Sequence, residues 1–441
     1  MKSDDYFGVP LHAWTLVDQN APINIYRHQA YQAILNGICA LPANIRSRIS
    51  AVTILGETHE MFPGLEKQGA GYSSGFNITD YSPAAIDGFR RWLQTRYHSI
   101  QQFNAAVGSS YNAFNAVQPP SKDLKTQKGT ARWQHLDAFA AGYVPVFGWA
   151  KDTRGRPFKI AVYLDGHLRG HTEADQNRTD VLEARPEFVT PNVGFRYDID
   201  FRSLRAGIHT VDVVAARPGK PPMLIASRPL VVMNSPGQTP RRRAVRSLAT
   251  VPMEPGFVAI DDAPAAGLTV LYNPLAALWS EYRNQTVRGF NESFGSQTHK
   301  SCIPSEKIFS HQILPSMYPD WNPYLEAVDA SLKPSSEYNP GVTLYGGAVF
   351  GDQFFRYKSK IGWKFYGVGE IHPLTKLTPK EYRKMFERHH DAGARYLAPY
   401  LMTLLYQGDV GGLADDRIAP DNPRRGSSDF YRALSDLMRN D

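Results

Sequence analysis

The chain has 441 residues, of which 42% are apolar and 21% charged, a composition typical of a globular protein with room for two domains. Its net charge of +7 is modest for this length, and the sequence has no apolar run near the ~20 residues that span a bilayer, which argues against a transmembrane protein. The two cysteines, Cys39 and Cys302, exclude a disulfide framework and a cysteine metal site, although one bridge is compatible with the sequence.

Residues 1–150 alternate short apolar segments with amphipathic ones. The predicted elements are strands at 8–17 and 49–55 and helices at 26–41 and 80–100. The last helix has the clearest start, because Ser82 is a favourable N-cap and Pro83 suits the first helical position. The N-terminus lacks the apolar stretch of a signal peptide, so the sequence assigns no compartment.

The pattern changes after residue 150. Residues 151–240 contain short alternating strands separated by turns such as Asp165-Gly166, and the sequence predicts no helix between 155 and 235. This pattern indicates an inserted immunoglobulin-like β-sandwich. The basic run RRRAVR at 241–246 has no interleaved aromatic residues, so we interpret it as a solvated linker and expect no nucleic-acid partner.

Strand–helix alternation resumes in residues 241–441. The predicted strands lie at 306–314, 341–350, 364–371 and 394–402. Before the last strand, Thr378 and Glu381 form a capping box and Gly393 ends the helix. Repeated strand–helix units predict a parallel sheet covered by helices, and their number favours a (β/α)-barrel of the TIM type over an open sheet.

Two predicted strand ends carry the same pattern, Gly-Glu-x-His, in VTILGETHE at 52–60 and FYGVGEIHP at 365–373. The flanking sequences differ, so the match is not a tandem repeat. Because catalytic residues of such barrels lie at the carboxyl ends of strands, we expect Glu57 and Glu370 to share one pocket. The alternative is that each glutamate caps a helix or lies exposed in a loop.

Two facing carboxylates suit acetal hydrolysis, in which one protonates the leaving oxygen and the other attacks the anomeric carbon or activates water. The zinc-peptidase pattern fails, because Pro63 stands where the second histidine is required. The sequence has no G-x-S-x-G elbow and no phosphate-binding loop. Scattered histidines together with the glutamates could still form a metal site, although we expect neither a metal nor another cofactor.

Residues 80–120 resemble a segment of family 42 β-galactosidases and of related glycoside hydrolases of clan A. In these proteins a helix ending in W-L-x-x-x-Y is followed by L-N-x-x-W-G-t-x-Y-x-s-F and a pair of prolines. The matching residues are Trp92, Leu93, Tyr97, Phe103, Asn104, Gly108, Tyr111, Phe114, Pro119 and Pro120. Val107 stands where the family has tryptophan.

The resemblance implies a (β/α)8 barrel in which the acid/base glutamate ends strand four and the nucleophile ends strand seven. By order along the chain, Glu57 takes the first role, Glu370 the second, and 306–314 becomes strand six. The family's asparagine before the acid/base is replaced here by Gly56, and Glu60 is an alternative acid. Only about 50 residues precede Glu57, so we expect a barrel that is N-terminally incomplete or differently begun.

We therefore expect a β-galactosidase-like, retaining glycosidase that acts on an oligo- or polysaccharide. The candidate residues for orienting or stacking the sugar are His59, His311, His372, Asp352, Trp14, Phe62, Trp321 and Tyr400. Ordinary packing is the alternative for each of them. A rival hypothesis is a non-catalytic carbohydrate-binding or surface protein on a degenerate barrel. The sugar, the linkage, the role of the sandwich and the presence of a homo-oligomer stay open.

Overall fold

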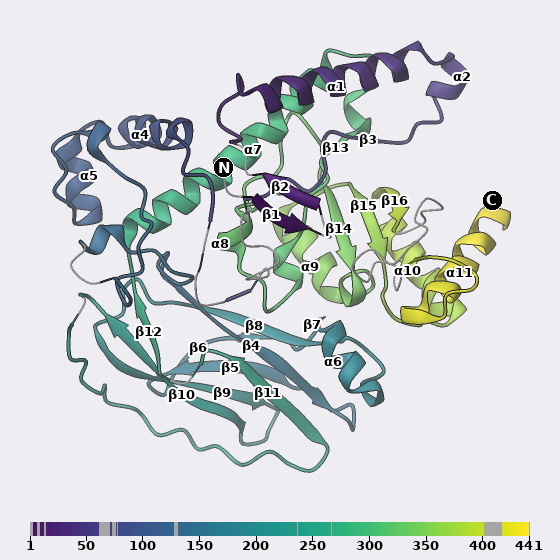
Figure 1. The fold of residues 1–441 in the computed structure, drawn as a ribbon. Helices are drawn as coiled ribbons and strands as arrows, with labels where there is room; N and C mark the ends of the chain where they lie inside the picture. Colours follow the sequence, from purple (N-terminus) through teal and green to yellow (C-terminus); the bar gives the residue numbers. More distant parts are fainter. Residues whose placement is uncertain are drawn as a thin grey trace. The chain divides into compact units, whose positions relative to one another are not determined.

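A computed structural model describes residues 3–6, 9–12, 15–60, 71–72, 76, 78–127, 131–235, 237–265, 267–400 and 417–440 of a mixed α/β protein (Figure 1). The chain divides into two compact units. The first unit takes its residues from 1–66, 284–317 and 326–441, and the second from 67–283 and 318–325. Two helices, α7 (Pro274–His299) and α8 (Pro323–Glu326), have residues in both units.

The second unit contains α4 (Pro83–Tyr97), which matches the predicted helix at 80–100, and a further helix that was not predicted, α5 (Ile100–Val107). As predicted, Ser82 caps α4, since its hydroxyl accepts a hydrogen bond from the Ala85 N–H (3.2 Å). After α5, the Asn104 side chain accepts from the Tyr111 N–H (3.0 Å) and donates to the Tyr111 carbonyl (2.7 Å). These bonds hold the loop after α5 in place.

The rest of the second unit consists mainly of two β-sheets (Figure 1). The strands are β4 (Tyr143–Asp152), β5 (Lys159–Leu164), β6 (His167–Thr172), β7 (Gln176–Asn177), β8 (Asn192–Asp200), β9 (Gly207–Ala216), β10 (Met223–Met233), β11 (Phe257–Ala263) and β12 (Leu268–Leu271). One sheet has the order β12-β10-β9-β5-β6 and the other β11-β4-β8-β7. Apolar side chains from both sheets, such as Val146 and Val213, form one core, so the sheets pack as a sandwich.

The sandwich departs from the sequence prediction in two respects. Its sheets extend beyond the expected limits of 151 and 240, because β4 begins at Tyr143 and β11 pairs with β4 across more than a hundred residues of chain. A short helix, α6 (Thr179–Ala184), lies where no helix was predicted, since one turn and a half is too short to show a helical period. The predicted turn is present, with positive φ at Asp165 (53°) and Gly166 (76°).

The first unit combines short strands with helices. An antiparallel hairpin of β1 (Ser3–Tyr6) and β2 (Val9–His12) precedes the other elements. These are α1 (Pro22–Ala40), α2 (Ala43–Arg46), β3 (Val52–Thr53), β13 (Ile308–Phe309), β14 (Gly341–Tyr345), α9 (Asp352–Ile361), β15 (Tyr366–His372), α10 (Pro379–Asp391), β16 (Ala394–Pro399) and α11 (Ser427–Asn440). The predicted strands at 8–17, 49–55 and 306–314 are all shorter than expected. The capping box of α10 is present, with the Glu381 N–H donating to the Thr378 hydroxyl (3.3 Å).

The parallel pair β3-β13 and the parallel three-stranded sheet β14-β15-β16 are joined by isolated parallel bridges, Phe309 with Asn339 and Gln312 with Val342, which gives the order β3, β13, β14, β15, β16. The sheet is strongly curved, because the rings of Tyr396 on β16 and Phe309 on β13 are 5.2 Å apart although two strands lie between them. Three steps across a flat sheet would cover about 14 Å. Gly367 makes room for the curvature, since a Cβ there would lie 2.0 Å from the Tyr396 ring. The strands that the structure describes do not close into a barrel.

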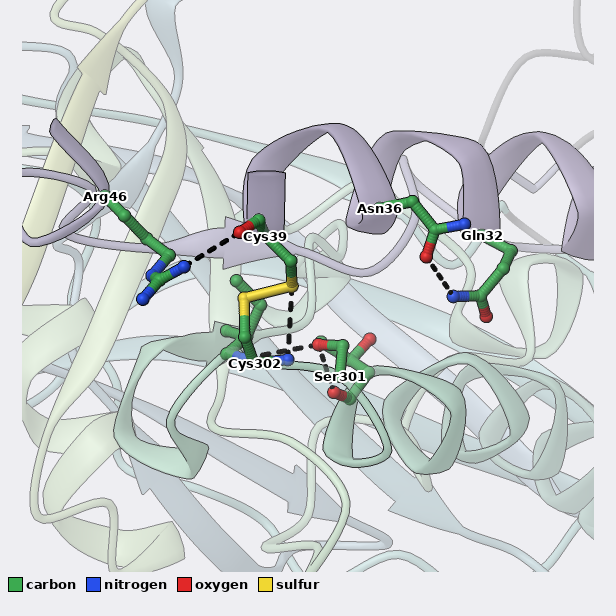
Figure 2. The surroundings of a disulfide bond; sticks show 8 residues. Gln32, Asn36, Cys39, Arg46, Ser301 and Cys302 are labelled. Carbon is green, nitrogen blue, oxygen red and sulfur yellow. Dashed lines mark hydrogen bonds between the residues drawn. A yellow bond between two sulfur atoms is a disulfide. The ribbon is translucent and has the colours of Figure 1, made fainter. Parts of the chain in front are cut away.

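A disulfide joins Cys39 at the end of α1 to Cys302 just after α7 (Figure 2). The Arg46 guanidinium donates to the Cys39 carbonyl (2.8 Å) and holds α2 against the end of α1. Because 263 positions separate the cysteines, the bridge restricts the unfolded chain. In the loop-closure model this loss of entropy raises the free energy of the unfolded state by about 5–6 kcal/mol. Among the described helices, none combines the length and the apolar character needed to cross a membrane.

Candidate active site

The two Gly-Glu-x-His segments meet at the carboxyl ends of the parallel strands. Glu57 follows β3, Glu370 lies in β15, and His311 follows β13. One oxygen of each carboxylate and a ring nitrogen of His311 all lie within 4.8 Å of one another. Because β3 and β15 are three positions apart in the strand order, the curvature of the sheet is what brings these side chains together.

A β-bulge aims Glu370 into this site. The register of β14 and β15 pairs Val342 with Val368 and then Thr343 with Glu370, so Gly369 is an extra residue on β15. An extra residue shifts the alternation of the strand by one position and turns the following side chain to the opposite face. Glu370 therefore shares a face of the sheet with Thr343.

The glycines before the two glutamates have different roles. A Cβ on Gly369 would lie 2.7 Å from the His311 Cδ2, so glycine is needed there for the imidazole to pack against the strand. A Cβ on Gly56 would meet no atom of the described residues within 4 Å. Packing therefore requires glycine at position 369, whereas no described residue requires glycine at position 56.

Each carboxylate accepts a hydrogen bond from a hydroxyl on β14. The Thr343 hydroxyl donates to the Glu57 Oε1 (2.5 Å), and the Tyr345 hydroxyl donates to the Glu370 Oε2. The His311 Nε2 lies 3.1 Å from the Thr343 Oγ1 and 3.7 Å from the Glu370 Oε1. Since the threonine hydroxyl donates its proton to Glu57, the imidazole Nε2–H is the donor to Thr343.

Burial raises the pKa of both carboxylates. Burial raises the pKa of Glu57 to about 7, against the hydrogen bond from Thr343, and the charge of Glu370 adds a smaller contribution. Burial is therefore a larger cause than the neighbouring carboxylate. Burial also raises the pKa of Glu370, and the hydrogen bond from Tyr345 opposes this rise. Burial lowers the pKa of His311, which favours the neutral imidazole.

The spacing of the glutamates limits the chemistry of the site. Carboxylates about 5–5.5 Å apart suit a covalent glycosyl intermediate, whereas inverting enzymes leave about 6.5–9.5 Å for a water molecule. One oxygen of Glu57 lies within 4.8 Å of one oxygen of Glu370, so the two carboxylates are close enough to act on the same bond. Two carboxylates and His311 are also donors that a divalent cation accepts.

A second group of metal-type donors lies in the second unit and is formed by Asp123, His135 and Asp137. The Lys125 ammonium lies 2.6 Å from the Asp137 Oδ2 and supplies a positive charge there. The Leu124 N–H donates to the His135 Nδ1 (3.3 Å), so that nitrogen is already used as an acceptor. We interpret this group as a structural ion network.

His59 and Glu60 follow Glu57 in the chain but are not among the donors grouped with Glu370. Burial lowers the pKa of His59 to about 4, so its ring is neutral at ordinary pH. Glu60 is 3% exposed, and its N–H donates to the Glu326 carbonyl (3.0 Å). Of the two glutamates proposed as the acid, only Glu57 joins the carboxylate pair.

Asp352 and His372, two further candidates for orienting the sugar, are not among the donors grouped with Glu57 and Glu370. Asp352 begins α9, its side chain is 69% exposed, and it accepts a hydrogen bond from Arg388 (2.6 Å). A carboxylate is favourable at a helix N-terminus without any catalytic role. His372 is 1% exposed, and its Nε2 lies 3.2 Å from the Ser427 Oγ at the start of α11. Packing against that helix explains its burial.

The four aromatic candidates for stacking on the sugar lie in different places. The Tyr400 ring lies 5.8 Å from that of Tyr345, the residue that donates to Glu370, so Tyr400 borders the site. Trp321 belongs to the second unit, where its ring stacks on Tyr318 at 4.5 Å. The remaining two candidates, Trp14 and Phe62, lie outside the described residues.

Sequence reasoning missed Thr343 and Tyr345. A signal was present, because both are hydrogen-bonding residues at alternate positions near the carboxyl end of a predicted strand. Such residues share one face of a strand, and that end of a parallel sheet is where catalytic residues gather.

Comparison with known proteins places few limits on this chain. No family model matches it, and no solved structure matches it. A β-1,2-glucosyltransferase from Ignavibacterium album is 22% identical over 130 residues, which cover 25% of this chain and 18% of that protein. The chain therefore spans less than a fifth of the length of the curated relative that it matches.

Proposed function

We propose that the protein is a retaining glycoside hydrolase in which Glu370 is the nucleophile and Glu57 is the acid/base. The observation that carries this proposal is the pair of carboxylate oxygens within 4.8 Å of each other, held at the ends of parallel strands. The resemblance of residues 80–120 to family 42 β-galactosidases supports the same chemistry and favours a β-galactoside as substrate.

The hydrogen bonds support the assignment of roles. With a pKa near 7, Glu57 keeps its proton at slightly acidic pH and can deliver it to the leaving oxygen. The Tyr345 hydroxyl stabilises the ionised form of Glu370, the form that attacks the anomeric carbon. Attack expels the protonated aglycone, and Glu57, now ionised, takes a proton from water as that water releases the sugar from Glu370.

The strand order supports a sector of a (β/α)8 barrel. In clan A the two glutamates end strands four and seven, and the order β3, β13, β14, β15 places two strands between Glu57 and Glu370. In that scheme β13 corresponds to strand five, not to strand six as its sequence position suggested, and β14 to strand six. The sandwich would then be an insertion between strands four and five.

Hydrolysis of aryl β-glycosides, beginning with the galactoside, tests the proposal. We expect wild-type turnover, a loss of at least about a thousandfold in Glu370→Ala, and partial rescue of that variant by azide. Asp352→Ala is the matched control, because this exposed carboxylate lies at a helix start and should leave turnover unchanged. Turnover that survives Glu370→Ala would exclude Glu370 as the nucleophile.

A second candidate function is glycosyl transfer, which the partial match to a β-1,2-glucosyltransferase favours. The same covalent intermediate would be resolved by a sugar hydroxyl in place of water, with Glu57 taking the proton of that hydroxyl. Product analysis with glucose as an added acceptor separates the two outcomes, since transfer yields a new disaccharide and hydrolysis yields only free sugar.

Two further hypotheses, a metal-dependent hydrolase and a non-catalytic binding protein, are tested by adding a chelator and by measuring saccharide binding. Inhibition by a chelator, reversed by a divalent cation, would indicate that Glu57, Glu370 and His311 hold a metal. A folded protein that binds saccharides without turnover, and still binds them after replacement of both glutamates, would be a non-catalytic binding protein.

A further inference from the structure

The arginine segment, residues 241–246, is an ordered part of the sandwich, contrary to the linker that its sequence suggested (Figure 1, between β10 and β11). The Ile208 N–H donates to the Arg241 carbonyl (2.9 Å), and the Arg243 N–H donates to the Ile208 carbonyl (2.9 Å). Further on, the Arg246 N–H donates to the Asp165 carbonyl (3.1 Å). The segment therefore pairs with the beginning of β9 and with the β5–β6 turn.

Two glycines allow this close approach. A Cβ on Gly207 would lie 2.6 Å from the Arg243 Cδ and 3.0 Å from the Arg241 carbonyl oxygen. A Cβ on Gly166 would lie 2.0 Å from the Arg246 carbonyl oxygen. A side chain at position 166 would displace the backbone of the segment, and one at position 207 would displace the Arg243 side chain, so the sandwich provides a fitted seat for the segment.

The four guanidinium groups of the arginine segment are exposed. Within the described part of the chain, none of them has an ion-pair partner. Seven other arginines of the sandwich do have a carboxylate within 4.0 Å, namely Arg156, Arg178, Arg185, Arg196, Arg202, Arg217 and Arg228. Residues 143–271 contain 17 Lys and Arg and 13 Asp and Glu, so the excess equals the four arginines of the segment.

We propose that the arginine segment is a binding surface for an anionic polysaccharide, a polymer whose sugars carry carboxylate or sulfate groups. The guanidinium fork donates two parallel hydrogen bonds to such an oxyanion, and a backbone already held in place loses little entropy on binding. The segment has no aromatic side chain on which a nucleobase could stack, and Val245 is its one large apolar residue. The choice of a polysaccharide rests on the proposed function, since a glycosidase would gain effective substrate concentration from such a surface.

Binding to chondroitin sulfate and to polygalacturonate, with neutral dextran as the blank, tests this surface. We expect the wild type to bind both anionic polymers and to lose at least about tenfold in affinity between about 50 and 300 mM salt, because exposed ion pairs are screened. Replacing Arg241, Arg242, Arg243 and Arg246 by glutamine should weaken binding by at least about tenfold. The charge-matched control replaces four exposed lysines of the first unit, Lys360, Lys364, Lys380 and Lys384, by glutamine and should change affinity less than about twofold.

Three outcomes would overturn the proposal. The first is that the wild type binds neither anionic polysaccharide. The second is that the lysine control loses as much affinity as the arginine variant. The third is that the wild type binds duplex DNA or phosphatidylserine vesicles more tightly than the polysaccharides. Thermal unfolding of both quadruple variants verifies that they fold. The Glu370→Ala variant should bind the polymers like the wild type, so loss of aryl-glycoside turnover with binding retained refutes only the proposed function. Turnover without polymer binding refutes only this surface.

Discussion

Replacing Thr343 by valine should raise the pKa of Glu57, because it deletes the hydroxyl that stabilises the ionised carboxylate while keeping the shape of the side chain. A hydrogen bond to a charged group contributes about 1.5–3 kcal/mol, and one pKa unit corresponds to about 1.4 kcal/mol. Glu57 is partly accessible to water, which can replace part of the lost bond. We therefore expect a rise of about one unit above the wild-type value of about 7.

The assay is a carbon-13 NMR titration of the glutamate side-chain carboxyl groups, in which Glu57→Gln identifies the resonance. This measurement does not require turnover. Where turnover is found, the alkaline limb of the rate profile should move upward with the pKa, because the protonated form of Glu57 is the acid. Thr343→Ser keeps the hydroxyl and is the control, with an expected pKa close to the wild-type value. A pKa in Thr343→Val at or below the wild-type value would falsify this account of the site.

Three other predictions concern Tyr345, Gly369 and the disulfide. Tyr345→Phe removes a hydrogen bond that lowers the pKa of Glu370, so the acidic limb of the rate profile should shift to higher pH; an unshifted limb would contradict the assigned role. Gly369→Ala should reduce kcat/KM by at least about a hundredfold, because the added Cβ displaces His311. Gly56→Ala is the control and should change kcat/KM less than about threefold. Equal losses of kcat/KM in the two variants would contradict the packing argument. Reduction of the disulfide should lower the free energy of unfolding of the first unit by up to about 5 kcal/mol, as measured by urea denaturation, and an unchanged midpoint would show that the bridge is not stabilising.

Helix boundaries could be predicted from the sequence because their signals are local. Ser82 caps α4 through a hydrogen bond to an N–H three residues away, and Thr378 and Glu381 cap α10 over the same separation. Gly393, which closes the segment after α10, has the positive φ (87°) that glycine adopts freely. In each case the residue type and its partner lie within one turn of the chain, so no tertiary information is needed.

The strands were harder to delimit. The ladder between β3 and β13 has two residue pairs, and beyond it the chain after β13 pairs with its other neighbour only through isolated bridges. The limits of the sandwich were also misplaced, because the pairing of β11 with β4 joins segments far apart in sequence. Local alternation indicates that a segment is extended but not which partner it pairs with.

The sequence predicted Glu57, Glu370 and His311 as site residues, and these three lie together. It also predicted residues that are not grouped with them. His372, two positions after Glu370, has its Nε2 3.2 Å from the Ser427 Oγ at the start of α11 and is not among the donors grouped with Glu57. The bulge at Gly369 decides the direction of the glutamate, and a bulge becomes visible only when the register with the neighbouring strand is known.

The sequence by itself determined the residue types available at the strand ends, the caps of the main helices and the presence of two glutamates in matched contexts. The tertiary structure decided that these glutamates meet, that Thr343 and Tyr345 adjust their pKa values, that Cys39 and Cys302 are bridged, and that the arginine segment is seated on the sandwich. The physical reason is the same for all four. Each depends on contacts between residues distant in sequence, which no local pattern encodes.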